Sequence, residues 1–104
     1  MTPELKDRFD HEIKSNKVVL YMKGTADFPR CGFSAAALEA LSRFGRVYTV
    51  DVLAEPEVRE GIKEYSNWPT IPQVYINGKF IGGSDIVADL AERGELEAMV
   101  NANS

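Results

Sequence analysis

The stretch VVLYMKGTADFPRCGFS, residues 18–34, decides the fold class of this 104-residue chain. Its first five residues, Val18 to Met22, form a short apolar run that is typical of a buried strand. The segment 23–30 contains a glycine and a proline and is expected to be a loop. From Cys31 to about Phe44 the apolar residues recur at helical spacing, and Gly45 ends the helix. The residues expected to face inward on this helix are Ala35, Leu38, Ala40 and Leu41. A strand, a loop and a helix in this order predict a β-α-β unit whose two strands are parallel.

The segments on either side of this stretch extend the pattern. Thr2-Pro3-Glu4 combines a hydroxyl cap, a proline and an acid, and this predicts a helix that ends near Ser15-Asn16. Residues 47–52 are the expected second strand. Glu55-Pro56-Glu57 begins a third helix, which runs to about Tyr65-Ser66.

The C-terminal third predicts a β-hairpin followed by two helices. Asn77-Gly78 lies between the segments 73–76 and 79–81, and this dipeptide is the strongest short signal of a hairpin. Gly82-Gly83-Ser84-Asp85 begins a fourth helix, and Gly94 starts or separates the last one. The element order α-β-α-β-α-β-β-α-α therefore predicts an α/β fold with a four-stranded mixed sheet flanked by helices on both faces.

Length and composition fit one domain over residues 1–104. Apolar residues make up 44% of the chain and charged residues 27%, and the net charge is −4. This acidity argues against binding to nucleic acid or to anionic lipid, both of which need a basic face. No apolar run approaches the ~20 residues of a membrane span. Residues 1–17 lack the apolar stretch of a signal peptide, which fits a bacterial cytoplasmic protein or a processed organellar form.

Cys31 is the only cysteine of the chain and His11 the only histidine. One chain therefore forms neither a disulfide nor a metal site of the usual Cys/His type, and any second thiol must come from outside. Cys31 lies at the first turn of a predicted helix with Lys23 and Arg30 nearby, conditions that lower a thiol pKa and favour a reactive thiolate. The alternative is a buried, inert core cysteine. His11 lies among polar residues and is expected to face solvent.

Ser34 occupies the place of the second cysteine in a C-x-x-C redox motif. A hydroxyl closes no disulfide, so a two-cysteine exchange cycle is blocked. Ser34 either hydrogen-bonds toward the Cys31 sulfur or is an exposed first-turn serine.

The segment Trp68-Pro69-Thr70-Ile71-Pro72 carries two prolines just before a predicted strand. Pro72 is a candidate for a cis peptide bond that turns the Thr70-Ile71 backbone outward, where it can pair with a peptide-like ligand. The alternative is an ordinary rigid loop. Trp68 is either part of this site or a plain core aromatic.

Two further groups add charge to this region. Arg59 and Lys63 share one face of the third helix, and Ser84 and Asp85 begin the fourth. Each group alone is an ordinary feature, a solvated charge pair or a helix cap. Together they match glutathione, which carries a thiol, two carboxylates, one ammonium group and a short peptide backbone.

Four segments in order give the chain a resemblance to a known family. They are Tyr21-Met22-Lys23-Gly24, Cys31-Gly32-Phe33-Ser34 after a longer loop, Ser66 to Gln73, and Gly82 to Ile86. The chain resembles the monothiol glutaredoxins of the CGFS class over essentially its whole length. The resemblance implies a thioredoxin-like fold with a cis-proline at Pro72 beside the glutathione site. It also implies glutathione contacts at Lys23, Cys31, Arg59, Lys63, Thr70, Ile71, Gly83, Ser84 and Asp85. Many relatives have cysteine where this chain has Ser84, so a disulfide between that position and Cys31 is unavailable here.

The same resemblance implies a [2Fe–2S] cluster with Cys31 as its metal ligand. Such a cluster usually takes four thiolates, and two chains with two glutathiones would supply them across a homodimer, whereas the cluster-free protein is expected to be a monomer. The implied partners are BolA-type proteins and iron–sulfur apo-proteins, and the implied function is cluster transfer. Two alternatives remain: a glutathione-dependent oxidoreductase that uses one cysteine, and a thiol-free interaction module.

Overall fold

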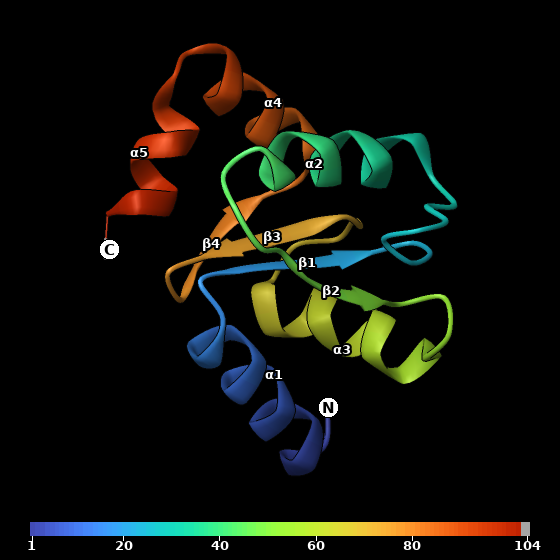
Figure 1. Ribbon diagram of the computed structural model, residues 1–104. Coiled ribbons are helices and arrows are strands. Elements are labelled where there is room, and N and C mark those ends of the chain that lie inside the picture. Colours follow the sequence, from blue (N-terminus) through green and yellow to red (C-terminus); the bar gives the residue numbers. More distant parts are fainter. Residues whose placement is uncertain (103–104) are drawn as a thin grey trace.

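The computed structural model describes residues 1–102 as five helices and four strands (Figure 1). The helices are α1 (Pro3–Ser15), α2 (Gly32–Ser42), α3 (Pro56–Ser66), α4 (Ser84–Glu92) and α5 (Glu95–Asn101). The strands are β1 (Val18–Met22), β2 (Tyr48–Asp51), β3 (Gln73–Ile76) and β4 (Lys79–Gly82). The predicted element order is confirmed.

The four strands form one mixed sheet in the order β2-β1-β3-β4. β1 is parallel to β2, with Val19 opposite Tyr48, and antiparallel to β3, with Val19 opposite Tyr75. β3 and β4 form the predicted antiparallel hairpin, whose turn holds Asn77 and Gly78 at positive φ. The end of β1, which leads into the Cys31 loop, therefore lies beside the start of β3, which follows Pro72.

Helices cover both faces of the sheet, as predicted: α1 and α3 lie on one side, and α2, α4 and α5 on the other (Figure 1). β1 serves both faces because successive side chains of a strand point in opposite directions. Val19 and Tyr21 pack with Phe9 of α1 and Ile62 of α3. Val18, Leu20 and Met22 pack with Leu41 of α2, Val87 of α4 and Leu96 of α5. All five residues of β1 are buried, which explains the uninterrupted apolar run in the sequence.

The interior face of α2 differs from the prediction. Its buried residues are Ser34, Ala37 and Leu41, whereas Ala35 and Ala40 are only half-buried. The apolar pattern did not identify the buried face, because apolar residues lie on nearly every face of this helix. In addition, the first residue of the buried face is a serine. The predicted strand 47–52 is also shorter at both ends, although the Val52 N–H still donates to the Met22 carbonyl at 2.9 Å.

His11, on α1, is exposed, as predicted. Within residues 1–102, none of the helices combines the length and the apolar character that crossing a bilayer requires.

Candidate functional site

Cys31 is the N-cap residue of α2, directly after the loop that follows β1. Its backbone is extended, with φ −145° and ψ 133°, and its side chain is partly exposed. The Ala35 N–H donates to the Cys31 carbonyl at 3.0 Å, so the helix begins at this residue. The alternative of an inert core cysteine is therefore wrong, and the thiol lies where the first N–H groups of a helix are available to it.

The surroundings of Cys31 hold the pKa of its thiol below the ordinary value. The largest cause is the backbone N–H of Ser34, and burial opposes it. The backbone N–H of Phe33, the positive charge of Lys23 and the Ser34 hydroxyl act in the same direction as the first cause. Each of these groups favours the thiolate because it offers a hydrogen bond or a positive charge to the sulfur.

Ser34 links Cys31 to the sheet. Its side chain is fully buried, and its hydroxyl oxygen accepts a hydrogen bond from the Lys23 N–H at 3.1 Å. The reading of Ser34 as an exposed first-turn serine is therefore wrong. The hydroxyl joins the end of β1 to the first turn of α2 and lies close enough to act on the Cys31 thiol.

We expect the rate of Cys31 alkylation by iodoacetamide to reach half its maximum at a pH below that of an ordinary thiol. Ser34→Ala should move this midpoint upward, because one group that favours the thiolate is lost. Because the folded pKa is lowered, Cys31 stabilises the fold at high pH, and this contribution is lost as the pH falls through the lowered value.

Ser42→Ala, which changes an exposed serine at the other end of α2, is the matched control and should leave the alkylation profile unchanged. If the Ser34→Ala profile overlays that of the unmodified protein, the hydroxyl does not act on the thiol.

The loop 24–30 precedes Cys31, and hydrogen bonds fix its first and last residues. The Arg30 N–H donates to the Lys23 carbonyl at 2.9 Å, and the Gly24 N–H donates to Asp51 Oδ1 at 2.9 Å. At the tip, Thr25 and Phe28 exchange two backbone hydrogen bonds of 3.3 and 3.2 Å. The loop is thus a fixed turn, and it holds Lys23 at the mouth of the site.

Gly24→Ala should lower the free energy of unfolding by about 3 kcal/mol or more. Gly24 has a φ of +96°, and a Cβ added there would lie 2.5 Å from the Phe28 carbonyl oxygen, a backbone atom that cannot move aside. Gly78→Ala is the control. Its φ of +82° is similar, but apart from its chain neighbours no heavy atom of residues 1–102 lies within 4 Å of the added Cβ, so only the backbone cost of about 1 kcal/mol remains. Urea unfolding measures both. Equal losses for the two variants would show that the loop opens to accept the side chain.

A pocket of about 460 Å³ lies beside this loop. Apart from Cys31, every residue predicted at the glutathione site lines it, namely Lys23, Arg59, Lys63, Thr70, Ile71, Pro72, Gly83, Ser84 and Asp85. Cys31 is not one of the lining residues, but Lys23, whose charge acts on its thiol, and Phe33, two residues further on, both are. The cysteine therefore lies at the edge of the pocket.

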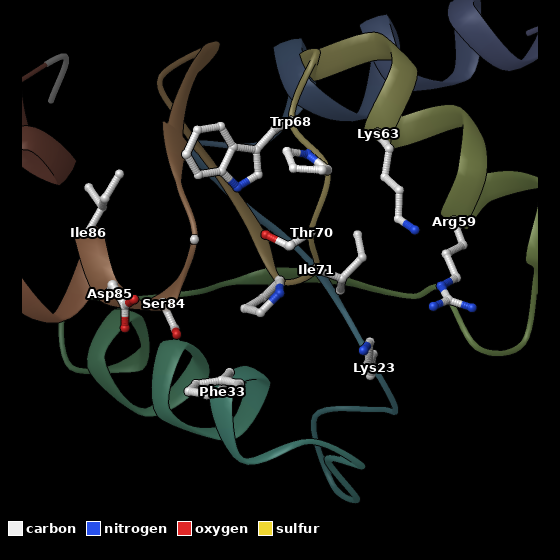
Figure 2. Close-up of a pocket in the computed structure, with 13 residues that line it drawn as sticks. Lys23, Phe33, Arg59, Lys63, Trp68, Thr70, Ile71, Ser84, Asp85 and Ile86 are labelled. Atoms are coloured by element: carbon white, nitrogen blue, oxygen red, sulfur yellow. The ribbon is translucent and has the colours of Figure 1, made fainter.

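Charge is separated along the pocket (Figure 2). Arg59, Lys63 and Lys23 lie toward one end, and Ser84 and Asp85 toward the other, with Thr70 and Ile71 between them. The Nε of Arg59 is buried and has no hydrogen-bond partner among residues 1–102, whereas Lys63 Nζ lies 3.4 Å from the Glu60 carboxylate. The pocket thus offers cations to one end of a ligand and a serine, a carboxylate and the start of α4 to the other.

The segment between these ends is the one with the two prolines. The Ile71–Pro72 peptide bond is cis, as predicted. No hydrogen bond joins the backbone N–H or C=O of Ile71 to any other residue in the range 1–102, so both remain for a ligand. Gly83 lies close to this segment, because a Cβ added to it would be 3.3 Å from the Pro72 carbonyl oxygen.

Four lining residues were not predicted as ligand contacts: Phe33, Trp68, Pro69 and Ile86. Trp68 is 37% exposed and packs against Phe80 with ring centroids 5.7 Å apart, so it is a wall of the pocket and not a plain core aromatic. Phe33 is 64% exposed. The only sequence signal for these four residues is that they lie close in the chain to predicted contacts. The sequence pattern alone does not distinguish an apolar pocket residue from a core residue.

A mixed sheet with a thiolate-prone cysteine at the first turn of α2, next to a cis-proline segment, defines a thioredoxin-like thiol protein. Comparison with known proteins narrows this class. A family model described as Glutaredoxin matches residues 18–81, and the chain belongs to the glutaredoxin family.

The similar proteins are monothiol glutaredoxins, which confirms the resemblance seen in the sequence. The chain is 54% identical to the uncharacterized monothiol glutaredoxin ycf64-like of Synechocystis sp. over 96% of this chain and 94% of that one. It is 47% identical to the mitochondrial monothiol glutaredoxin-5 of Saccharomyces cerevisiae, over 92% of this chain and 67% of that one. It is 48% identical to the chloroplastic monothiol glutaredoxin-S14 of Arabidopsis thaliana, of which it spans 58%.

The fold is confirmed in the same way. The solution structure of reduced poplar apo GrxS14 superposes with a TM-score of 0.86 at 46% identity, covering 97% of this chain and 94% of that one.

Proposed function

We propose that this protein binds glutathione and carries a [2Fe–2S] cluster that it passes to other proteins. The observation that carries the proposal is one thiolate-prone cysteine at the edge of a pocket whose two ends differ in charge. The sequence supplies one cysteine per chain, so companion thiolates must come from a second molecule.

Glutathione fits the pocket by its chemistry. Its glycyl carboxylate would face Arg59 and Lys63, since the buried Arg59 Nε has a donor to offer. Its backbone would pair with the free N–H and C=O of Ile71. Its second carboxylate would face the first N–H groups of α4 near Ser84, and its ammonium group Asp85. This arrangement brings the glutathione sulfur to the edge where Cys31 lies.

The cluster is the cargo of this site, and the donor set suits it. Thiolates are the preferred ligands of [2Fe–2S] clusters, and the surroundings of Cys31 favour its thiolate form. Within residues 1–102 no three His, Cys, Asp or Glu side chains gather where they could hold a metal ion. Two chains and two glutathiones would supply four thiolates, so we expect a homodimer with cluster and a monomer without it. The exchangeable glutathione ligands would suit transfer to iron–sulfur apo-proteins or a mixed complex with a BolA-type protein.

The alternative is a glutathione-dependent oxidoreductase. In that reaction the Cys31 thiolate attacks the glutathione sulfur of a mixed disulfide, and the protein thiolate leaves. A second glutathione then attacks the Cys31–glutathione disulfide, which releases glutathione disulfide and restores the Cys31 thiolate. The lowered pKa of Cys31 favours this activity as well. The fixed loop 24–30 opposes it, because a rigidly held thiol does not adjust to the in-line geometry of attack.

Anaerobic reconstitution with iron, sulfide and glutathione separates the two functions. A carrier should become a coloured dimer, with visible absorption and a doubled mass, only when glutathione is present. A colourless monomer that rapidly reduces a glutathione mixed disulfide would contradict the carrier proposal.

We further propose that residues 1–104 act as one domain in the bacterial cytoplasm or inside an organelle. The similar proteins include a cyanobacterial, a chloroplastic and a mitochondrial one, which supports either setting.

A further inference from the structure

Gln73 is a buried polar residue that the proposed function does not use. It is the first residue of β3, directly after Pro72, and it is fully buried. Its Nε2 donates two hydrogen bonds, to the Trp68 carbonyl at 3.1 Å and to the Thr70 carbonyl at 3.3 Å. Both acceptors belong to the segment that lines the middle of the pocket.

The composition of that segment explains why it needs a side-chain donor. Pro69 and Pro72 have no N–H, so the segment 68–72 is poor in backbone donors of its own. The Trp68 N–H is already engaged with the Lys63 carbonyl and the Ser66 hydroxyl, both at 3.1 Å. The carbonyls of Trp68 and Thr70 therefore receive their hydrogen bonds from the buried Gln73 side chain.

The oxygen of the same amide shows that space filling alone does not explain why a glutamine occupies position 73. In the part of the chain that the structure describes, its Oε1 is buried and has no hydrogen-bond partner, and burial of an unpaired acceptor is unfavourable. The amide cannot turn over to relieve this, because Oε1 would then face two carbonyl oxygens. An apolar side chain of the same size would fill the space without an unpaired atom, so the residue is useful for its two donors.

We propose that Gln73 is a positioning residue that holds the Trp68–Ile71 segment in its ligand-binding shape. The amide draws the carbonyls of Trp68 and Thr70 inward and leaves the groups of Thr70 and Ile71 that face the pocket free for a ligand. The proposal rests on glutathione binding at this pocket, but the shape of the segment is measurable without any ligand.

Trp68 is the only tryptophan of the chain, and its own carbonyl is one of the two acceptors. Its fluorescence therefore reports on the segment in the ligand-free protein. In Gln73→Met, which keeps the size and removes the donors, we expect acrylamide quenching of Trp68 to rise about two-fold. The dissociation constant for glutathione, measured by calorimetry, should rise about ten-fold. The pH profile of Cys31 alkylation should not move, because no hydrogen bond joins Gln73 to the Cys31 loop.

Gln73→Glu provides a second variant and an internal rescue. Its ionised carboxylate lacks both donors, but the carboxyl regains one when it is protonated. Acidification should therefore return its Trp68 quenching toward that of the unmodified protein. Asn77→Asp is the matched control, because the Asn77 side chain donates to the Met99 carbonyl at 2.9 Å from the opposite end of β3. It should leave the fluorescence and the affinity unchanged.

The outcomes separate this proposal from the proposed function. Unchanged Trp68 quenching and unchanged affinity in a folded Gln73→Met protein would overturn the positioning role. If the unmodified protein fails to bind glutathione while Gln73→Met still exposes Trp68, the proposed function fails and the positioning role stands.

Discussion

Cys31→Ser is expected to abolish cluster uptake completely. Serine has nearly the shape of cysteine, but its hydroxyl is not ionised near neutral pH and is a poor ligand for iron in a cluster of this kind. Because Cys31 is partly exposed and only begins α2, the variant should unfold within a few degrees of the unmodified protein. Its affinity for glutathione should change less than about three-fold, since the charged contacts belong to other residues. Visible absorption after anaerobic reconstitution, thermal unfolding and calorimetry measure the three quantities.

The same variant distinguishes the three functions considered for this chain. A cluster carrier and an oxidoreductase both lose their activity without the sulfur, whereas a thiol-free interaction module does not. A coloured dimer formed by Cys31→Ser would mean that another atom holds the cargo, and the role of Cys31 would be wrong.

The fold was predictable because its local signals agree with one another. The apolar run of β1, the Asn77-Gly78 turn and the proline near the start of α3 each indicate one structure, and the tertiary contacts do not override any of them. The interior face of α2 was less predictable, because Ala35, Ala37 and Ala40 have identical side chains. Only the position of the sheet decides which of them is buried.

The candidate site was predictable to a different degree. Charge and backbone chemistry suggested that residues from α3, the proline segment and α4 serve one ligand, and the structure brings them to one pocket. The role of Ser34 depends on its burial and on the hydrogen bond that it accepts from the Lys23 N–H. The role of Gln73 depends on hydrogen bonds to two backbone carbonyls, one of which lies five residues earlier in the sequence. No sequence pattern reports such contacts, because they depend on how the loops return to the sheet.

Arg59→Met is expected to weaken glutathione binding by roughly ten- to a hundred-fold, the equivalent of one charge-assisted hydrogen bond of about 1.5–3 kcal/mol. The Nε of Arg59 is buried and has no hydrogen-bond partner within residues 1–102, so a bound anion would give this donor a partner. The thermal stability should therefore stay the same or rise slightly when the side chain is removed, although glutathione binding is weakened. Arg59→Lys keeps the charge but loses the planar fork, and it should give an intermediate affinity.

Arg46→Met is the control for this series. Arg46 is exposed and precedes β2, and because β1 and β2 are parallel it lies at the end of the sheet opposite to Lys23. Loss of this charge should leave the dissociation constant, measured by calorimetry at two salt concentrations, close to that of the unmodified protein. An equal weakening by Arg46→Met and Arg59→Met would show that net charge alone attracts the ligand. A weakening confined to Arg59→Met would assign the carboxylate contact to the cationic end of the pocket. That end would then fix the direction in which glutathione lies, with its sulfur toward Cys31.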